Sequence, residues 1–146
     1  MILGFLLVGL FGFSALAGEG WLTDFNKAKK EAAEKKLPIL VDFSGSDWCG
    51  WCIKLNKEVF SQKEFKVFAK DNVVLFKADF PRAKKLSAEV KAQNKQLQQA
   101  YSIKGFPTVL LLDAGGKVIA RTGYQRGGAG AYVKHLKKLL AKSGSK

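Results

Sequence analysis

The sequence predicts an α/β domain in which a central mixed β-sheet is covered by helices on both faces. Two apolar segments, residues 39–43 and 73–80, are typical of buried strands, and the stretch between them has helical periodicity. A third strand, residues 108–112, precedes a turn and a partner strand, as in a hairpin. The chain has 146 residues, of which 47% are apolar, so it has the size of one domain with a packed core.

The first helix is expected to begin after Thr23 and to end near residues 35–36, ahead of Pro38. Apolar residues recur at helical spacing between these points. The next strand, residues 39–43, is continuously apolar except at Asp42, as expected when both faces of a strand are covered. An ionised carboxylate is costly to bury there, so Asp42 either has a raised pKa and a partner or points outward at the strand end.

Both cysteines of the chain lie in residues 48–52, Trp-Cys-Gly-Trp-Cys. Cysteines separated by two residues can close a small disulfide when the first one starts a helix. The free N–H groups and the dipole of a helix N-terminus favour an anion, so the thiolate of Cys49 should form easily. We therefore predict that Cys49 is the nucleophile and that Cys52 resolves the mixed disulfide that Cys49 makes with a substrate.

The helix that begins at Cys49 is expected to reach Phe60, and residues 61–64 have the pattern of a capping box that opens another helix. Residues 87–101 form a further helix with a narrow apolar stripe, and we assign its polar side chains to solvation. After the hairpin, whose second strand is residues 117–122, the last helix spans about residues 129–141.

Three blocks of the sequence together resemble the thioredoxin superfamily: residues 39–52, then Lys77, then residues 101–108. The likeness runs from about Trp21 to the C-terminus and is greatest to small secreted bacterial proteins with an extra helix before the Pro107 block. It implies a thioredoxin-like fold. The sequence departs from the family at one point: Asp42 lies seven positions before Cys49, one more than is common. The longer loop leaves open whether the Asp42 side chain reaches the cysteines.

The resemblance also implies roles for individual residues. Asp42 and Lys77 match a buried acid and its lysine partner, which move protons to and from the resolving cysteine. Pro107 matches a cis-proline that packs against the disulfide, and Phe106 then offers its backbone to an extended substrate. The loop that contains Gly123 is expected to lie beside the active site as part of the substrate groove.

Trp48 and Trp51 flank the nucleophile, where they serve either as ordinary packing residues or as substrate contacts. Trp51 stands where thioredoxins carry proline, so we expect it to be exposed and to help grip unfolded substrates. The Gly50-Trp51 dipeptide is similar to the Gly-aromatic dipeptides of disulfide isomerases.

Residues 1–17 are apolar and uncharged and end in Ala-Leu-Ala, a pattern typical of signal peptides. We expect cleavage near Ala17 and export of the thioredoxin-like domain, residues 18–146, to the bacterial periplasm or the extracellular space. An uncleaved anchor is the alternative, although a spanning helix needs about 20 apolar residues. In an oxidising compartment a single cysteine pair forms either a structural disulfide or a redox-active one. A disulfide that closes a loop of only two intervening residues adds little stability, which favours the redox-active interpretation.

Charge is distributed unevenly: residues 1–80 hold eleven basic and ten acidic residues, whereas residues 81–146 hold fourteen and two. The excess of basic residues in positions 81–146 can attract acidic partners or anionic envelope surfaces, or it can serve solubility alone. No basic-aromatic motif indicates nucleic-acid binding. A structural zinc site needs four ligands, and the chain has two cysteines and one histidine, so we expect no metal and no cofactor beyond the disulfide.

These observations predict an exported thiol-disulfide oxidoreductase that reduces or isomerises protein disulfides. We expect it to act as a monomer on proteins with disulfides or thiols and to receive electrons from a membrane or soluble donor. The alternative is a non-catalytic binding protein that holds a partner with the groove and the basic C-terminal half, with the cysteine pair as a passive bridge.

Overall fold

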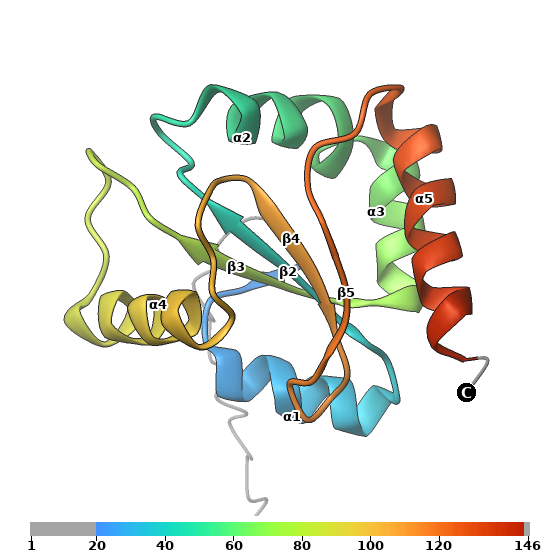
Figure 1. Cartoon of the computed structure of the whole chain (residues 1–146), viewed down its shortest axis with the longest axis horizontal. Coiled ribbons are helices and arrows are strands. Elements are labelled where there is room, and N and C mark those ends of the chain that lie inside the picture. The colour runs from blue at the N-terminus through green and yellow to red at the C-terminus, as the bar shows by residue number, and fades with distance from the viewer. Residues whose placement is uncertain (1–19, 145–146) are drawn as a thin grey trace, which may run out of the picture.

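Five strands form one sheet in the order β1-β3-β2-β4-β5 (Figure 1). Strand β2 lies at the centre, parallel to β3 and antiparallel to β4. Strand β1 is parallel to β3, and β5 is antiparallel to β4. The strands are β1 Trp21–Leu22, β2 Ile39–Ser44, β3 Val74–Asp79, β4 Thr108–Leu112 and β5 Val118–Thr122.

The computed structural model describes residues 20–144. The expected signal peptide, residues 1–17, and its cleavage position near Ala17 lie outside the described residues. Within residues 20–144, no helix combines the length and apolar character needed to cross a bilayer.

Helices cover both faces of the sheet, so the predicted fold class is confirmed (Figure 1). Helices α1 and α4 pack on one face, and α2, α3 and α5 pack on the other. The predicted extra helix before Pro107 is α4. The bounds are α1 Phe25–Lys35, α2 Gly50–Leu55 with its π-helical continuation η1 Asn56–Phe60, α3 Lys63–Asn72, α4 Ala88–Ala100 and α5 Gly128–Ser143.

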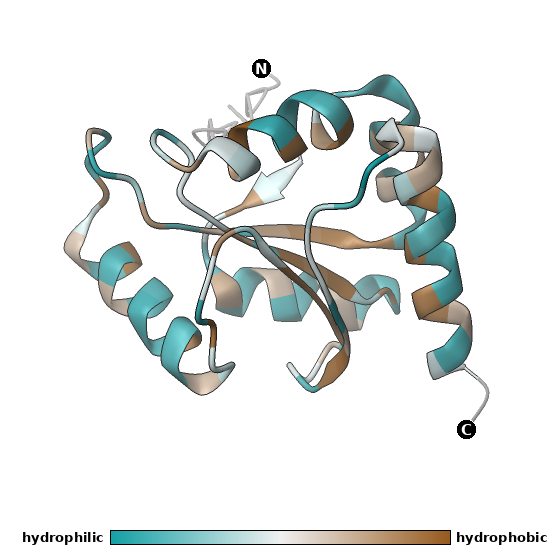
Figure 2. Ribbon diagram, turned by 45° about the horizontal axis from the view of Figure 1, so that its top comes forward, coloured by the Kyte–Doolittle hydropathy of each residue, from teal (hydrophilic) through white to brown (hydrophobic). Residues whose placement is uncertain are grey.

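Strand β2 is buried along its whole length, which explains its continuous apolar sequence. Its side chains alternate between two cores: Ile39, Val41 and Phe43 pack with α1 and α4, and Leu40 packs with α2, α3 and α5. Figure 2 shows these central strands as hydrophobic segments between helices with hydrophilic outer faces. By the same alternation Asp42 shares the face of Leu40, beneath α2.

Two predicted helix starts are wrong in detail. The N-cap of α1 is Asp24 rather than Thr23, and its carboxylate accepts a hydrogen bond from a backbone N–H of the first turn. The Ser61 hydroxyl donates to the carbonyl of Asn56, so it ends η1 instead of opening a capping box. Helix α3 begins after Gln62, whose side chain makes no capping hydrogen bond. The sequence pattern alone could not show which of two adjacent residues, Thr23 or Asp24, caps α1, or whether Ser61 ends one helix or opens the next.

Two polar residues of α4 hold it to β3 and to the start of α1, so our assignment of the polar side chains to solvation is wrong for these two. Asn94 is only 1% exposed, and its amide donates to the carbonyl of Asp79 at 3.0 Å. The side chain of Gln93 accepts from the Phe25 N–H at 2.8 Å and donates to the Thr23 carbonyl at 2.9 Å. These bonds satisfy backbone groups at the end of β3 and the start of α1.

Replacing Asn94 by alanine is expected to lower the free energy of unfolding by about 1–3 kcal/mol, because it removes a buried hydrogen bond and leaves a carbonyl without its donor. Urea titration followed by tryptophan fluorescence measures this change. Gln96→Ala, at an exposed position of the same helix, is the matched control and should shift the unfolding free energy by less than about 0.5 kcal/mol. Equal losses in the two variants would contradict the anchoring role.

Candidate active site

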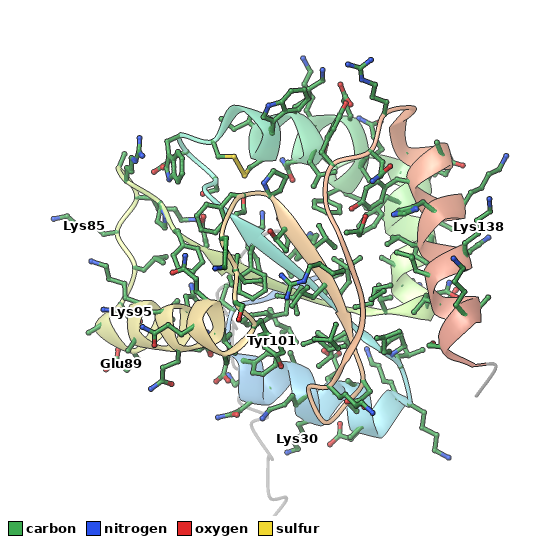
Figure 3. The ribbon with its side chains drawn as sticks, viewed as in Figure 1. Lys30, Lys85, Glu89, Lys95, Tyr101 and Lys138 are labelled. Carbon is green, nitrogen blue, oxygen red and sulfur yellow. A yellow bond between two sulfur atoms is a disulfide. The ribbon has the colours of Figure 1, made fainter. Side chains whose placement is uncertain are left out.

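Cys49 and Cys52 form a disulfide at the start of α2, visible as the yellow bond in Figure 3. Their Cα atoms are 5.2 Å apart. Cys49 is the N-cap residue, with φ −83° and ψ 109°, and its Sγ accepts a hydrogen bond from the Cys52 N–H at 3.3 Å. The predicted helix start is therefore confirmed. In this position backbone N–H groups and the helix dipole stabilise negative charge on Sγ.

The two cysteines differ in exposure. Cys49 is 8% exposed and Cys52 is 4% exposed, so the first cysteine is the more accessible. Cys52 Sγ also accepts from the Gly45 N–H at 3.5 Å. An added Cβ at Gly45 would lie 2.5 Å from the Trp48 ring, so only glycine allows the active-site loop, residues 45–48, to fold this closely.

Asp42 is 3% exposed and lies on the sheet face that α2 covers. Its Oδ2 is 4.0 Å from Lys77 Nζ, and the two residues are opposite each other in the β2–β3 register. Its Oδ1 accepts no hydrogen bond from residues 20–144. Burial raises the pKa of Asp42 to about 7, against the lowering effect of Lys77, and Asp79 raises it further. The structure thus brings together the acid and the lysine that the resemblance paired.

A second buried carboxylate, Asp79, was missed in the sequence. It is 7% exposed and accepts hydrogen bonds from the N–H and the hydroxyl of Ser46, at 3.0 Å and 2.6 Å. Asp79 follows Lys77 by two positions on β3, so the two side chains share one face of the sheet. This alternation along the strand is the sequence signal that could have placed Asp79 beside Lys77. A pocket of about 340 Å³ lies beside both residues and extends to Trp21, whose ring is 5.3 Å from Lys77 Nζ.

Trp48 is held firmly on one side of the disulfide. Its indole N–H donates to the Phe80 carbonyl at 2.7 Å, and its ring meets that of Phe106 edge-on at 6.0 Å. The Arg82 guanidinium lies 4.0 Å from the centre of the indole. Phe80 also stacks on Phe106 at 5.0 Å. With 37% of its surface exposed, Trp48 presents an apolar face beside Cys49.

Asp47 joins the active-site loop to the β3–α4 loop, residues 80–87. Its carboxylate accepts hydrogen bonds from the backbone N–H groups of Arg82, Ala83 and Lys84 at 2.9, 2.8 and 2.9 Å. These bonds, that from Arg82 first, hold the pKa of Asp47 below its ordinary value. The sequence carried no local signal for them, because the partners are 35 to 37 positions apart.

Trp51 is 52% exposed, which confirms its expected exposure. Its ring packs against Tyr124 at 5.0 Å, and Lys54 Nζ lies 5.1 Å and 5.6 Å from the centres of the two rings. The Tyr124 hydroxyl donates to Glu58, which fixes the pair. No atom within 4 Å would meet a Cβ added at Gly50, so open space adjoins the dipeptide between the cysteines.

The Phe106–Pro107 peptide bond is cis, as the resemblance implied. Gly123 lies beside it: a Cβ on Gly123 would be 3.3 Å from the Pro107 carbonyl oxygen. The Gly123 carbonyl accepts a hydrogen bond from the hydroxyl of buried Tyr132 at 2.9 Å. The β5–α5 connection is thus held against the Pro107 turn.

Reversible thiol–disulfide exchange is the chemistry that this arrangement supports, since a helix-start thiolate is both a good nucleophile and a good leaving group. Within residues 20–144, no group of three or more His, Cys, Asp or Glu side chains is placed to hold a metal. The fold and the site together define a thiol-disulfide oxidoreductase.

Comparison with known proteins identifies the family. The family model described as a thioredoxin-like domain matches residues 25–139, and the chain belongs to this family. It is 36% identical over 116 residues to the disulfide bond reductase DsbH of Chlamydia pneumoniae, covering 80% of this chain and 70% of that protein. A solved structure of a DsbH oxidoreductase aligns with a TM-score of 0.79 at 36% identity over 83% of each chain. The thioredoxin-related protein DsbJ of the same organism is 32% identical over 103 residues, which are 70% of this chain but 30% of DsbJ.

The stability of the oxidised protein should fall as the pH rises from about 4 to about 7. In this interval unfolded Asp42 has already lost its proton while the buried carboxyl still holds it, so rising pH favours unfolding. The total loss is on the order of 4 kcal/mol, from about three pKa units. Asp42→Asn should remove this fall, as measured by urea unfolding across the range. Parallel profiles for the variant and the natural protein would contradict the raised pKa.

Proposed function

We propose that this protein is an exported protein-disulfide reductase or isomerase that works through Cys49 and Cys52. The thiolate of Cys49 attacks a substrate disulfide, and one substrate sulfur leaves as a thiolate. Cys52 then attacks Cys49 Sγ, which breaks the mixed disulfide and releases the second substrate sulfur. Two electrons pass to the substrate and the Cys49–Cys52 disulfide forms. The observation that carries the proposal is the N-cap position of Cys49, with the Cys52 N–H directed at its sulfur.

Asp42 and Lys77 manage the proton of Cys52 in this scheme. Cys52 must lose its proton before it attacks, and a group with a pKa near 7 exchanges protons efficiently at neutral pH. Support comes from the raised pKa of Asp42, the 4.0 Å approach of Lys77 and the pocket beside Lys77, through which protons can exchange with solvent.

The substrate chain binds across the disulfide between two aromatic surfaces. Trp48 and Phe106 form one of them, and Trp51 with Tyr124 forms the other. An extended substrate segment pairs with the backbone at Phe106 and Pro107, while Gly50 leaves room for it and Gly123 lines the groove where the β5–α5 connection approaches the Pro107 carbonyl. Exposed aromatic rings suit contact with the apolar side chains of unfolded chains.

Reduction rather than primary oxidation is the favoured direction, supported by the likeness to a protein named as a disulfide bond reductase. A reductase must be recharged, so the proposal includes a membrane-bound or soluble electron donor. The protein acts as a monomer in the periplasm or the extracellular space. The apolar, uncharged residues 1–17 with their Ala-Leu-Ala end support export.

Cys49→Ser should abolish reduction of insulin disulfides, because the attacking thiolate is lost. Cys52→Ser should keep the attack but accumulate mixed disulfides, which are visible on non-reducing gels and by mass spectrometry. A titration of thiolate absorbance in the reduced protein should place the Cys49 pKa below the free value of about 8.5. Full activity of Cys49→Ser, or an unshifted pKa, would instead favour a passive bridge.

The exported form should begin near residue 18 when the full chain is produced with a bacterial secretion system. N-terminal sequencing of the protein recovered from the periplasm measures the cleavage point. Ala15→Asp with Ala17→Asp should block cleavage, since signal peptidase requires small residues there. A protein that keeps residues 1–17 after export would show an anchor instead.

A further inference from the structure

We propose that a basic pocket beside the active site binds an acidic segment of the protein substrate; this inference rests on the function proposed above. The basic pocket has a volume of about 640 Å³ and lies between the β3–α4 loop and α4. Five cationic side chains line it: Arg82, Lys84, Lys85, Lys91 and Lys95.

The cations come from both walls of the basic pocket. Lys84 and Lys85 belong to the loop, whereas Lys91 and Lys95 are four positions apart and so share one face of α4. Figure 3 shows Lys85 and Lys95 at this end of the molecule, with Glu89 on the other side of α4. Within residues 20–144, none of the five cations forms an ion pair with a carboxylate. Their charge is therefore available to a ligand.

The one acidic residue of the lining is Asp79. Its carboxylate is buried and already accepts two hydrogen bonds from Ser46, so it offers little repulsion to an incoming anion. The basic pocket thus concentrates part of the positive charge of residues 81–146 at one place, where it raises the local concentration of anionic ligands.

Two contacts connect the basic pocket to the disulfide. Arg82 lines the pocket and also lies against Trp48, which flanks Cys49. Phe80 lines it and stacks on Phe106, where the substrate backbone is expected to pair. Asp47 holds the loop in this position through three backbone hydrogen bonds. A chain that crosses Phe106 and Trp48 therefore next meets the basic pocket.

The shape of the pocket favours a polypeptide over a membrane surface. Its cations face a shared hollow from two sides, and a flat bilayer cannot enter such a hollow. Phe80, Pro81 and Leu86 also contribute apolar lining, which suits a segment that carries both carboxylates and apolar side chains. The inferred substrate is a protein with an acidic stretch next to its reactive cysteine.

Binding is tested with a fluorescent, cysteine-free acidic peptide and the oxidised protein, by anisotropy at about 0.1 M salt, where the Debye length is about 10 Å. Lys85→Glu with Lys95→Glu should raise the Kd about tenfold, because two attractive charges become repulsive. Lys30→Glu with Lys138→Glu is the matched control, since it changes the net charge equally at exposed positions on α1 and α5 (Figure 3). The control should shift the Kd by less than about twofold. Equal effects of the two double variants, or no binding by the natural protein, would overturn the proposal.

Kinetics separate this proposal from the function on which it rests. Two disulfide peptides, one with acidic and one with neutral flanks, are compared by kcat/KM. The pocket variant should lose about tenfold on the acidic peptide and retain its rate on the neutral one. Binding of the acidic peptide without reduction of either would refute the proposed function alone. Equal kcat/KM losses on both peptides would refute the pocket. The proposal would also be refuted if the pocket variant lost binding to phosphatidylglycerol vesicles while its peptide binding stayed unchanged. That result would show that the cationic side chains bind a membrane surface.

Discussion

The site depends on one constraint: the side chain of Cys49 must occupy the N-cap of α2 while Cys52 lies in the first turn of the same helix. That arrangement brings the Cα atoms within 5.2 Å and directs the Cys52 N–H at Cys49 Sγ. A sulfur in this position is stabilised as an anion before any substrate arrives. The rest of the molecule holds this helix start in place and buries most of both cysteine side chains.

The central strand places a titratable group, Asp42, in a buried environment beneath α2. Because β2 is buried along its whole length, Asp42 lies beneath α2 among apolar neighbours. Burial disfavours the ionised carboxylate, and this raises the pKa of Asp42. Lys77 compensates only in part at 4.0 Å. The raised pKa of this carboxyl therefore follows first from its burial in β2, whereas the pairing of β3 with β2 brings Lys77 beside it and limits the rise.

Two acidic residues outside the chemistry organise the loops. Asp79 anchors Ser46 of the active-site loop, and Asp47 of the same loop anchors the backbone at Arg82. Their hydrogen bonds explain how the loop that is one residue longer than usual stays ordered around Trp48. They also hold the loop that lines the basic pocket against Trp48, so the proposed substrate preference follows from the same anchoring that shapes the active-site loop.

The sequence by itself determined the strands other than β1, the main helices, the cysteine motif and the exposure of Trp51. Periodic burial and helix-start chemistry are local properties that leave a pattern in neighbouring residues. Resemblance to a family supplied the pairing of Asp42 with Lys77 and the cis bond at Pro107. Only the tertiary structure decided the two-residue strand β1, the buried Asn94 and the anchoring by Asp47 and Asp79. Contacts between residues fifteen or more positions apart depend on how strands pair and loops cross, and no local pattern records them.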